Sequence, residues 1–322
     1  MTPQEYIESE LLKLKEPLEF ESVSSEKLEE AILARVMSKK FRKLKADKPA
    51  FETAREAIRI SVKKGEPIRL MLFFGGNKLW SLPESPEIDW GELFALIYYA
   101  NWAKYISQVY KPGAVIEYFS MDIATIRMNN LTKEEVDLYT KGMRSLIKWI
   151  GPYLSSGVRI KYTRMGDLYN SYEDFIKEID IAKKNWIDNN GILLPEMNDE
   201  KNMAVELNVR LNPGQDEDPD WRAKIELEHR GIFGTKIGGD YMWDPSLIPH
   251  CPTWYSGFVA TGSTKKSLAK FWVGVGVLEK KGNSFNEIIL SPKQLERADF
   301  KWEKISIKGL DGKNFDKIRV LN

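Results

Sequence analysis

Cysteine and histidine are scarce in this sequence, which excludes several kinds of site. The single cysteine, Cys251, cannot form a disulfide within the chain or build a cysteine-based zinc or iron–sulfur centre. His229 and His250 are the only two histidines, so a polyhistidine metal centre is not expected. A carboxylate-bound Mg²⁺ would leave little trace in a sequence. We expect no metal and no cofactor, and expect catalysis to rest on Lys, Arg, Asp, Glu, Tyr and at most one histidine.

Net charge and long hydrophobic runs are lacking as well. Forty-eight Lys and Arg against 47 Asp and Glu give a net charge of +1, too little to draw the whole molecule to nucleic acid or membrane. The longest apolar run, near residues 93–103, is too short to span a membrane and contains Asn101. Glu5, Glu8 and Glu10 argue against a signal peptide. We expect a cytoplasmic protein that binds neither membrane nor nucleic acid; its oligomeric state stays open, a homodimer included.

A short apolar run that ends in glycine predicts a buried strand. Residues 67–78 read Pro-Ile-Arg-Leu-Met-Leu-Phe-Phe-Gly-Gly-Asn-Lys, a run too short for a helix and too apolar for a surface strand. Gly75, Gly76, Asn77 and Lys78 then stand at its carboxyl end, where open α/β sheets bind their ligands. The alternative for these four residues is a tight turn with a solvated lysine.

Strand and helix patterns alternate after this run. Strands are predicted at 114–119 and 157–163, and helices at 89–109, 132–150 and 172–189. Connections of this length between strands indicate a parallel βαβαβ sheet. We predict an α/β fold with a Rossmann-like, mostly parallel sheet, organised as a helical lead-in (1–64), a main domain (65–250) and a C-terminal antiparallel β extension packed on it (251–322).

Polar residues follow each predicted strand at its carboxyl end. Ser120 and Asp122 follow the second strand, and Arg164 and Asp167 follow the third. Because the carboxyl ends of parallel strands share one edge of a sheet, we expect these residues to meet those at 75–78. Five further candidates for the site lie within or beyond these segments: Glu117, Arg127, His229, Arg230 and Lys236, the last three flanking a glycine-rich turn predicted at 231–239.

Each candidate has a chemical role and a plainer alternative. Lys78 could form a Schiff base with a sugar carbonyl or hold a phosphate, and Asp122 could bind an amine or act as a general base. The arginines suit bidentate recognition of carboxylate or phosphate, with His229 or His250 as the acid–base group. Against this, Arg164 and Asp167 could form a surface ion pair, and either histidine could be structural.

Several segments together resemble the pyoverdine/dityrosine biosynthesis family, the isonitrile synthases. The similarity runs over about residues 30–165. Its parts are Lys63-Lys64-Gly65-Glu66-Pro67-Ile68, the loop with Lys78, Leu82-Pro83-Glu84, Val109-Tyr110-Lys111-Pro112-Gly113-Ala114, Ser120-Met121-Asp122 and, more loosely, Pro252-Thr253-Trp254-Tyr255. The chain departs from the family where Gly75-Gly76-Asn77 replaces Pro-x before the lysine and Ser120-Met121-Asp122 replaces Ser-Asp-Gly.

The resemblance implies an enzyme that condenses the α-amine of an amino acid with a carbon from a pentose phosphate such as ribulose 5-phosphate. Its substrates would be small molecules, with the residues named above as catalytic (Lys78, Asp122, His229) or substrate-binding. Two other functions stay open from the residues alone. One is an aminoacyl- or nucleotide-using transferase, which the missing phosphate-loop motif disfavours. The other is a non-enzymatic module that binds a small molecule in an aromatic pocket.

Overall fold

The computed structural model describes residues 1–41, 48–74, 87–120, 122–128, 131–192, 220–236, 251–252, 274–290 and 292–321. Its α-helices are α1 (Pro3–Lys15), α2 (Leu28–Val36), α3 (Lys48–Lys64), α5 (Trp90–Ser107), α6 (Asp122–Met128), α7 (Lys133–Ile150), α8 (Tyr172–Asn190), α10 (Trp221–Phe233) and α12 (Pro292–Glu296). Short 3₁₀ turns are η1 (Ser25–Lys27), η2 (Gly151–Tyr153) and η3 (Gly166–Leu168). The strands are β1 (Ile68–Phe74), β2 (Ala114–Ser120), β3 (Val158–Arg164), β4 (Cys251–Pro252), β5 (Val275–Lys281), β6 (Ser284–Leu290), β7 (Phe300–Lys304) and β8 (Lys317–Leu321).

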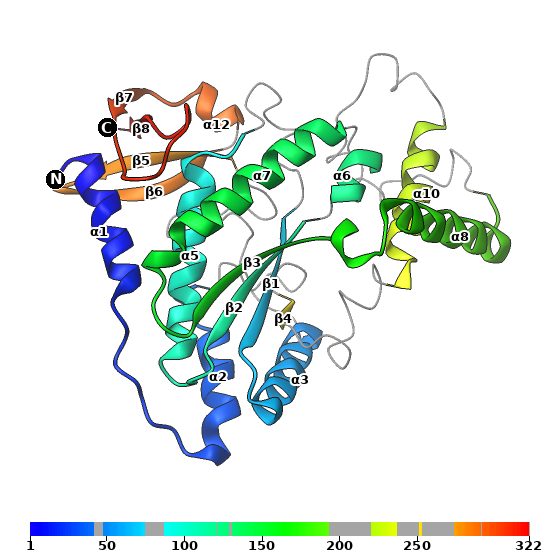
Figure 1. Ribbon diagram of the computed structural model, residues 1–322, viewed down its shortest axis with the longest axis horizontal. Helices are drawn as coiled ribbons and strands as arrows, with labels where there is room; N and C mark the ends of the chain where they lie inside the picture. The colour runs from blue at the N-terminus through cyan, green and yellow to red at the C-terminus, as the bar shows by residue number, and fades with distance from the viewer. Residues whose placement is uncertain are drawn as a thin grey trace.

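The first sheet is parallel, with the strand order β3-β2-β1-β4 (Figure 1). β1 lies between β2 and β4, and Leu70 and Leu72 on it are fully buried, which confirms the prediction of a central strand. Phe74, Ser120 and Arg164 are paired in register at the carboxyl ends of β1, β2 and β3. The α/β fold predicted from the alternating pattern is therefore present, and its strand ends share one edge.

Helix α5 is the central helix of the core. It begins at a capping box in which Asp89 accepts a hydrogen bond from the N–H of Gly91 and Glu92 accepts one from the N–H of Asp89. Most of its side chains are buried, including Phe94 and Trp102, as its aromatic-rich pattern predicts. The helix packs on β2 and β3 along its length and reaches the second sheet at its first turn.

Two glycines allow β2 and β3 to start side by side, at the edge of the sheet opposite the carboxyl ends of the strands. Gly113 has a φ of 74° and Gly157 a φ of 83°, both in the left-handed region that favours glycine. A Cβ on Gly113 would lie 1.9 Å from the carbonyl oxygen of Gly157. The same carbonyl accepts the N–H of Ala114 at 2.9 Å, so the contact fixes the register of β2 and β3.

The second sheet has the strand order β6-β5-β8-β7 and packs beside the first turn of α5 (Figure 1). Its pairs β5–β6 and β7–β8 are antiparallel, as predicted, but β5 and β8 run parallel, so the extension is a mixed sheet. Gly282 makes the β5–β6 hairpin turn with a φ of 58°. Cys251 and Pro252 belong to the first sheet, because β4 pairs with β1.

Helices α6, α8 and α10 form a separate group that packs together at the end of the molecule away from the second sheet (Figure 1). A second hydrophobic cluster, which includes Met71, Phe119, Phe175 and Ile232, joins this group to the sheet. Residues 231–233 are helical in α10, so the glycine-rich turn predicted at 231–239 does not start at Gly231. The side chain of Ile232 is fully buried, so α10 continues through this residue to Phe233 instead of turning at Gly231.

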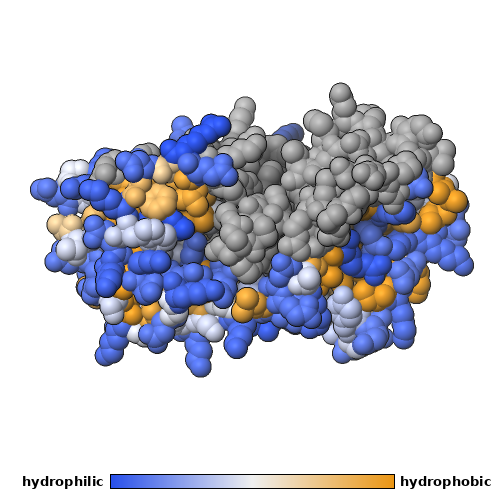
Figure 2. All heavy atoms as spheres, turned by 90° about the horizontal axis from the view of Figure 1, so that it is seen from above, coloured by the Kyte–Doolittle hydropathy of each residue, from blue (hydrophilic) through white to orange (hydrophobic). Residues whose placement is uncertain are grey.

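The face of the molecule seen from above is mostly hydrophilic where its residues are described. Seen from above, hydrophobic side chains appear as small separate patches among polar ones (Figure 2). None of the helices within the described ranges combines the length and apolar character needed to cross a membrane.

Candidate functional site

The candidate site lies where β2 and β3 end. Ser120 is the last residue of β2 and Arg164 the last of β3, and the two are paired in register. Asp122 follows as the first residue of α6. The sheet therefore brings the two described strand ends together, as the parallel topology predicts. Gly75, Gly76, Asn77, Lys78 and His250 lie outside the described residues.

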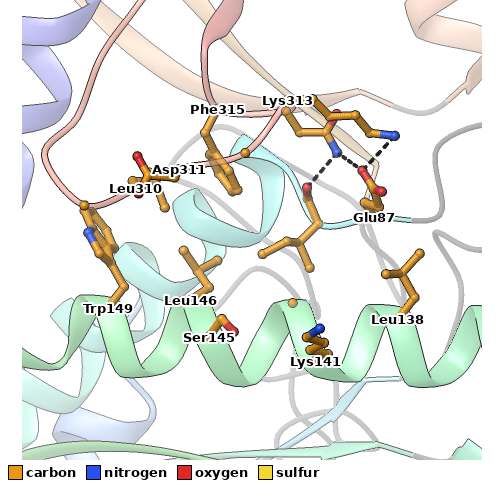
Figure 3. Close-up of a pocket in the computed structure, with 15 residues that line it drawn as sticks. Glu87, Leu138, Lys141, Ser145, Leu146, Trp149, Leu310, Asp311, Lys313 and Phe315 are labelled. Atoms are coloured by element: carbon orange, nitrogen blue, oxygen red, sulfur yellow. Dashed lines mark hydrogen bonds and ion pairs between the residues drawn. The ribbon is translucent and has the colours of Figure 1, made fainter.

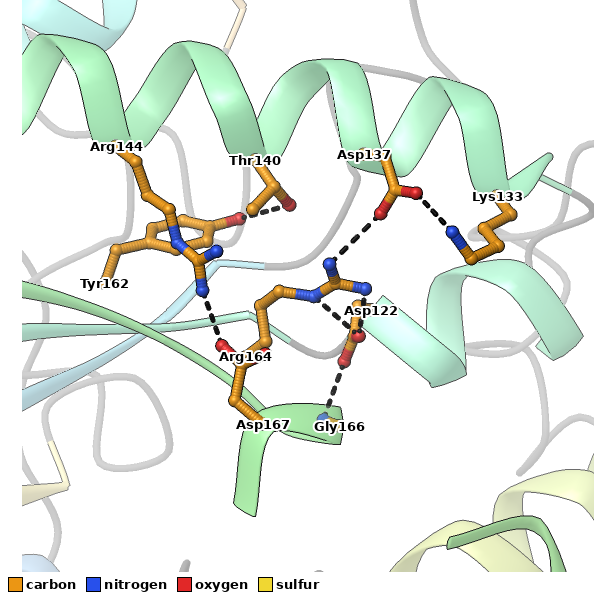
Figure 4. Close-up of polar contacts among 9 residues, drawn as sticks. All are labelled: Asp122, Lys133, Asp137, Thr140, Arg144, Tyr162, Arg164, Gly166 and Asp167. Carbon is orange, nitrogen blue, oxygen red and sulfur yellow. Dashed lines mark hydrogen bonds and ion pairs between the residues drawn. The ribbon is translucent and has the colours of Figure 1, made fainter. Parts of the chain in front are cut away.

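Asp122 and Arg164 form the centre of the site (Figure 4). Arg164 donates to Oδ2 of Asp122 from Nε at 2.9 Å, with Nη2 at 2.8 Å from the same oxygen. The N–H of Gly166 in η3 donates to Oδ1 at 3.2 Å. Asp122 is 1% exposed, so its negative charge is held away from water by a guanidinium and a backbone N–H.

Helix α7 supplies charged residues that the sequence analysis did not single out. Asp137 Oδ1 lies 3.0 Å from Nη1 of Arg164, and Lys133 donates to Asp137 at 2.5 Å (Figure 4). Arg144 donates to Asp167 at 2.5 Å, and Arg164 pairs with Asp122 and Asp137, so the alternative of an Arg164–Asp167 ion pair is not what the structure shows. Burial lowers the pKa of Arg164, but Asp122 and Asp137 raise it by more, so the guanidinium stays charged.

Neutral hydroxyls surround the same strand ends. Tyr162, two residues before Arg164, is hydrogen-bonded to Ser120 and lies 3.4 Å from the hydroxyl of Thr140 on α7. Burial raises the pKa of Tyr162, which keeps the phenol protonated and able to donate. Ser120 is itself buried. The arrangement offers one buried ion pair beside hydroxyl groups, which suits a substrate that carries both charge and hydrogen-bonding groups.

Glu117 lies on the other face of the sheet from Ser120 and Arg164. Residues of alternate parity point to opposite faces of a strand, and 117 differs from 120 by three. Its carboxylate accepts a hydrogen bond from Nε of Arg69 on β1 at 3.0 Å and another from Thr163 on β3 at 2.9 Å. Glu117 thus ties three strands together beneath the site.

The remaining predicted residues belong to the group of α6, α8 and α10. Arg127 on α6 contacts Glu228 on α10, with Nε 2.6 Å from Oε2, and Lys183 on α8 donates to the same carboxylate at 2.6 Å. Burial lowers the pKa of Arg127, and its hydrogen bond and charge contact with Glu228 raise it by more. These ion pairs fasten three helices to one another.

His229 and Arg230 on α10 also face their own helix group. The ring of His229 packs on Phe233 at 4.5 Å, and burial lowers the pKa of this histidine. Arg230 pairs with Glu226 at 2.7 Å and lies over the ring of Trp186. Lys236 is exposed just past the end of α10. The contacts of His229 and Arg230 described above are therefore with residues of α8 and α10.

Tyr172, at the start of α8, feels charges from the site and from the helix group. Burial is the main cause that raises the pKa of its phenol; the charge of Arg127 lowers this pKa and the charge of Asp122 raises it. The side chains missed by sequence reasoning (Asp137, Thr140, Arg144, Tyr162 and Tyr172) come from helix and strand faces. One signal for the first three is their spacing of three and four residues along α7, which places them on one side of the helix.

Among the residues that the structure describes, no group of three or more His, Cys, Asp or Glu is arranged to hold a metal ion.

Comparison of the whole chain with solved structures reveals a similarity of fold. The fold is similar to that of the PvcA protein from Pseudomonas aeruginosa. The superposition has a TM-score of 0.53 and 14% sequence identity, and it covers 91% of this chain and 99% of PvcA. No family model matches the sequence, and no curated protein matches it.

Proposed function

We propose that this protein is a biosynthetic enzyme of the isonitrile-synthase type, which condenses the α-amine of an amino acid with a carbon from a pentose phosphate. The observation that carries the proposal is the buried Asp122–Arg164 pair at the carboxyl edge of the parallel sheet. Ligands of open α/β sheets bind at this edge. The fold similarity to PvcA and the motifs in residues 63–122 support the same choice.

The ion pair suits an amino acid because that substrate is a zwitterion. In the proposal, Arg164 binds the substrate carboxylate through parallel N–H donors, and Asp122 accepts a proton from the ammonium group. Removing that proton frees the nitrogen lone pair for attack on a sugar carbonyl, and loss of the carbonyl oxygen as water then leaves the nitrogen joined to the sugar carbon as an imine. In the proposal, Tyr162 and Ser120, which are hydrogen-bonded to each other, donate to the oxygen of that carbonyl as it becomes negative.

Lys78 is the residue proposed to engage the sugar. A lysine amine that is partly desolvated has a lowered pKa and can form a Schiff base with a carbonyl. The proposal predicts an adduct at Lys78 when the protein is incubated with ribulose 5-phosphate and borohydride, measured by intact mass. The Lys78→Ala variant should show none. An adduct that persists in this variant would assign the carbonyl chemistry to another amine.

The deciding experiment follows the transferred carbon. The purified protein is incubated with ¹³C-labelled ribulose 5-phosphate and a panel of amino acids, and products are analysed by mass spectrometry. We expect one amino acid to gain a single labelled carbon on its nitrogen. Asp122→Asn and Arg164→Gln should reduce turnover by roughly a hundredfold or more, as expected for groups that contact the reacting substrate. Arg59→Gln, at an exposed arginine on α3, should leave turnover unchanged.

The opposite result is equally clear. If no amino acid acquires label from any pentose phosphate, the condensation is ruled out. If Asp122→Asn and Arg164→Gln fold and turn over as fast as the wild type, the site lies elsewhere.

A further inference from the structure

A hollow of about 380 Å³ lies away from the strand ends, between the outer side of α7 and the loop at 309–315 (Figure 3). Its walls are apolar, formed mainly by Ile88, Leu138, Leu146, Trp149, Leu310 and Phe315. Leu138, Gly142 and Trp149, spaced four and seven residues apart along α7, lie on the side of the helix that lines the hollow. A volume of this size is in the range of small-molecule pockets.

Hydrogen bonds hold the hollow open in a defined shape. Asn314 donates to the carboxylate of Glu87 and to the carbonyl oxygen of Ile88, both at 3.1 Å. The indole N–H of Trp149 donates to the carbonyl oxygen of Lys308 at 3.1 Å. The loop is therefore fastened at two places, so a ligand would enter a site that needs little rearrangement.

One cation at the rim is available for a ligand. Lys141 lines this hollow and also a neighbouring one of about 510 Å³ that contains Arg144 and Arg164. Within the described ranges, Lys141 forms no ion pair, whereas Arg144 pairs with Asp167 and Lys313 pairs with Glu87 at 3.1 Å.

The acidic groups of the hollow do not neutralise this lysine. Glu87 is paired with Lys313, and Asp311 lies at the other end of the hollow, beside Leu310 and Trp149 (Figure 3). At the end near Leu138, the ammonium of Lys141 therefore lies next to an apolar wall and, among the described residues, has no carboxylate partner in an ion pair.

We propose that this hollow binds a small amphipathic organic anion, an aromatic ring system bearing one acidic group. The rings fill the space between Leu146, Leu310 and Phe315, and the acidic group contacts the ammonium of Lys141. Such a site is separate from the Asp122–Arg164 pair and would hold a second ligand, an effector or a distal part of a substrate.

The proposal is tested with two probes of nearly equal shape that differ in charge. 1-Anilinonaphthalene-8-sulfonate is the anion, and N-phenyl-1-naphthylamine is its neutral analogue. Fluorescence titration should show saturable binding of the anion at one site. Lys141→Gln should weaken binding of the anion about fivefold, the effect of losing one exposed ion pair, and leave the neutral probe unchanged. Ser145→Phe, which fills the hollow from α7, should abolish saturable binding of both.

Lys177→Gln on α8 is the matched control, since it removes the same charge from an exposed lysine elsewhere. It should bind both probes as the wild type does. The proposal fails if the wild type shows no saturable binding of the anion, if Lys141→Gln and Lys177→Gln weaken it equally, or if Ser145→Phe, folded by near-ultraviolet circular dichroism, still binds. None of these results depends on catalytic activity.

Discussion

Arg164 reaches one carboxylate oxygen of Asp122 with two guanidinium nitrogens, at 2.9 and 2.8 Å, across the ends of two neighbouring strands. The carboxylate is 1% exposed, whereas the arginine keeps part of its side chain accessible. A buried charge of this kind is stable only while its partner is present. The pair is therefore a structural clamp between β2 and β3 at the centre of the candidate site.

Replacing both partners should cost less stability than the two single replacements added together. Arg164→Gln leaves a buried carboxylate without its cation, and we expect a loss of roughly 3–5 kcal/mol in the free energy of unfolding. The double variant Asp122→Asn/Arg164→Gln should lose less than the sum of the two single variants, because the remaining groups are neutral. Urea denaturation of the four proteins measures the coupling. Strictly additive losses would show that the two side chains do not stabilise each other.

The sequence predicts the strand ends better than it predicts the side chains around them. The sequence predicts that Asp122 and Arg164 lie close together, because the carboxyl ends of parallel strands share one edge of the sheet. Glu117 and Ser120 are three residues apart on one strand, so the sequence also predicts that they face opposite sides of the sheet. Asp137 and Arg144 could not be assigned, since nothing local distinguishes a charged helix face that covers a site from one that faces water. His229 and Arg127 carry suitable chemistry, but Arg127 finds its partner in Glu228 on α10, and His229 packs on Phe233 of its own helix.

The stability of the protein should fall in mild acid, and His229 should be one cause. Burial lowers the pKa of His229 below its ordinary value of 6.5. The unfolded chain therefore binds a proton at this histidine more readily than the folded chain does, so stability is complete above pH 6.5 and is lost as the pH falls through and below that value. Coulombic contacts with Glu226, which raises the pKa, and Arg230, which lowers it, are smaller than the effect of burial.

The histidine contribution is isolated by comparing two proteins over the same pH range. The free energy of unfolding of the wild type, minus that of His229→Gln, should decrease between pH 7 and pH 5, by at most about 1.4 kcal/mol per pH unit. A difference that stays constant with pH would mean that His229 titrates alike in the folded and unfolded chains.

Gly276 should be intolerant of even one methyl group. A Cβ there would lie 2.2 Å from the backbone nitrogen of Gly91 and 2.4 Å from the carbonyl carbon of Trp90, where β5 meets the first turn of α5. These are backbone atoms, so the two elements must separate. We expect Gly276→Ala to lower the unfolding free energy by about 1–3 kcal/mol or more. Gly151→Ala is the control, because a Cβ at Gly151 meets nothing within 4 Å and its φ is −45°. Equal effects at both positions would disprove close packing of the second sheet on α5.

Cys251 can report on the opening of β4, the edge strand of the first sheet at the other end of the strand order from β3. The thiol is fully buried in β4, and burial raises its pKa to about 12. Because the thiolate is the reactive form, the native cysteine should react with a disulfide reagent only after the segment opens. Strand β4 pairs with β1 through two residues, so we expect this opening to be local and to cost less than global unfolding.

The Gly276→Ala variant distinguishes local from global opening. If β4 opens locally, the labelling rate of Cys251 in native buffer should be the same in wild type and variant, although the variant is less stable overall. If labelling requires global unfolding, the variant should react faster by the factor that its loss of stability dictates, about tenfold for each 1.4 kcal/mol. The Cys251→Ser protein should take up no label under either condition. Equal rates would place the β4 contact among the weakest in the first sheet, next to the strand whose carboxyl end leads toward Lys78.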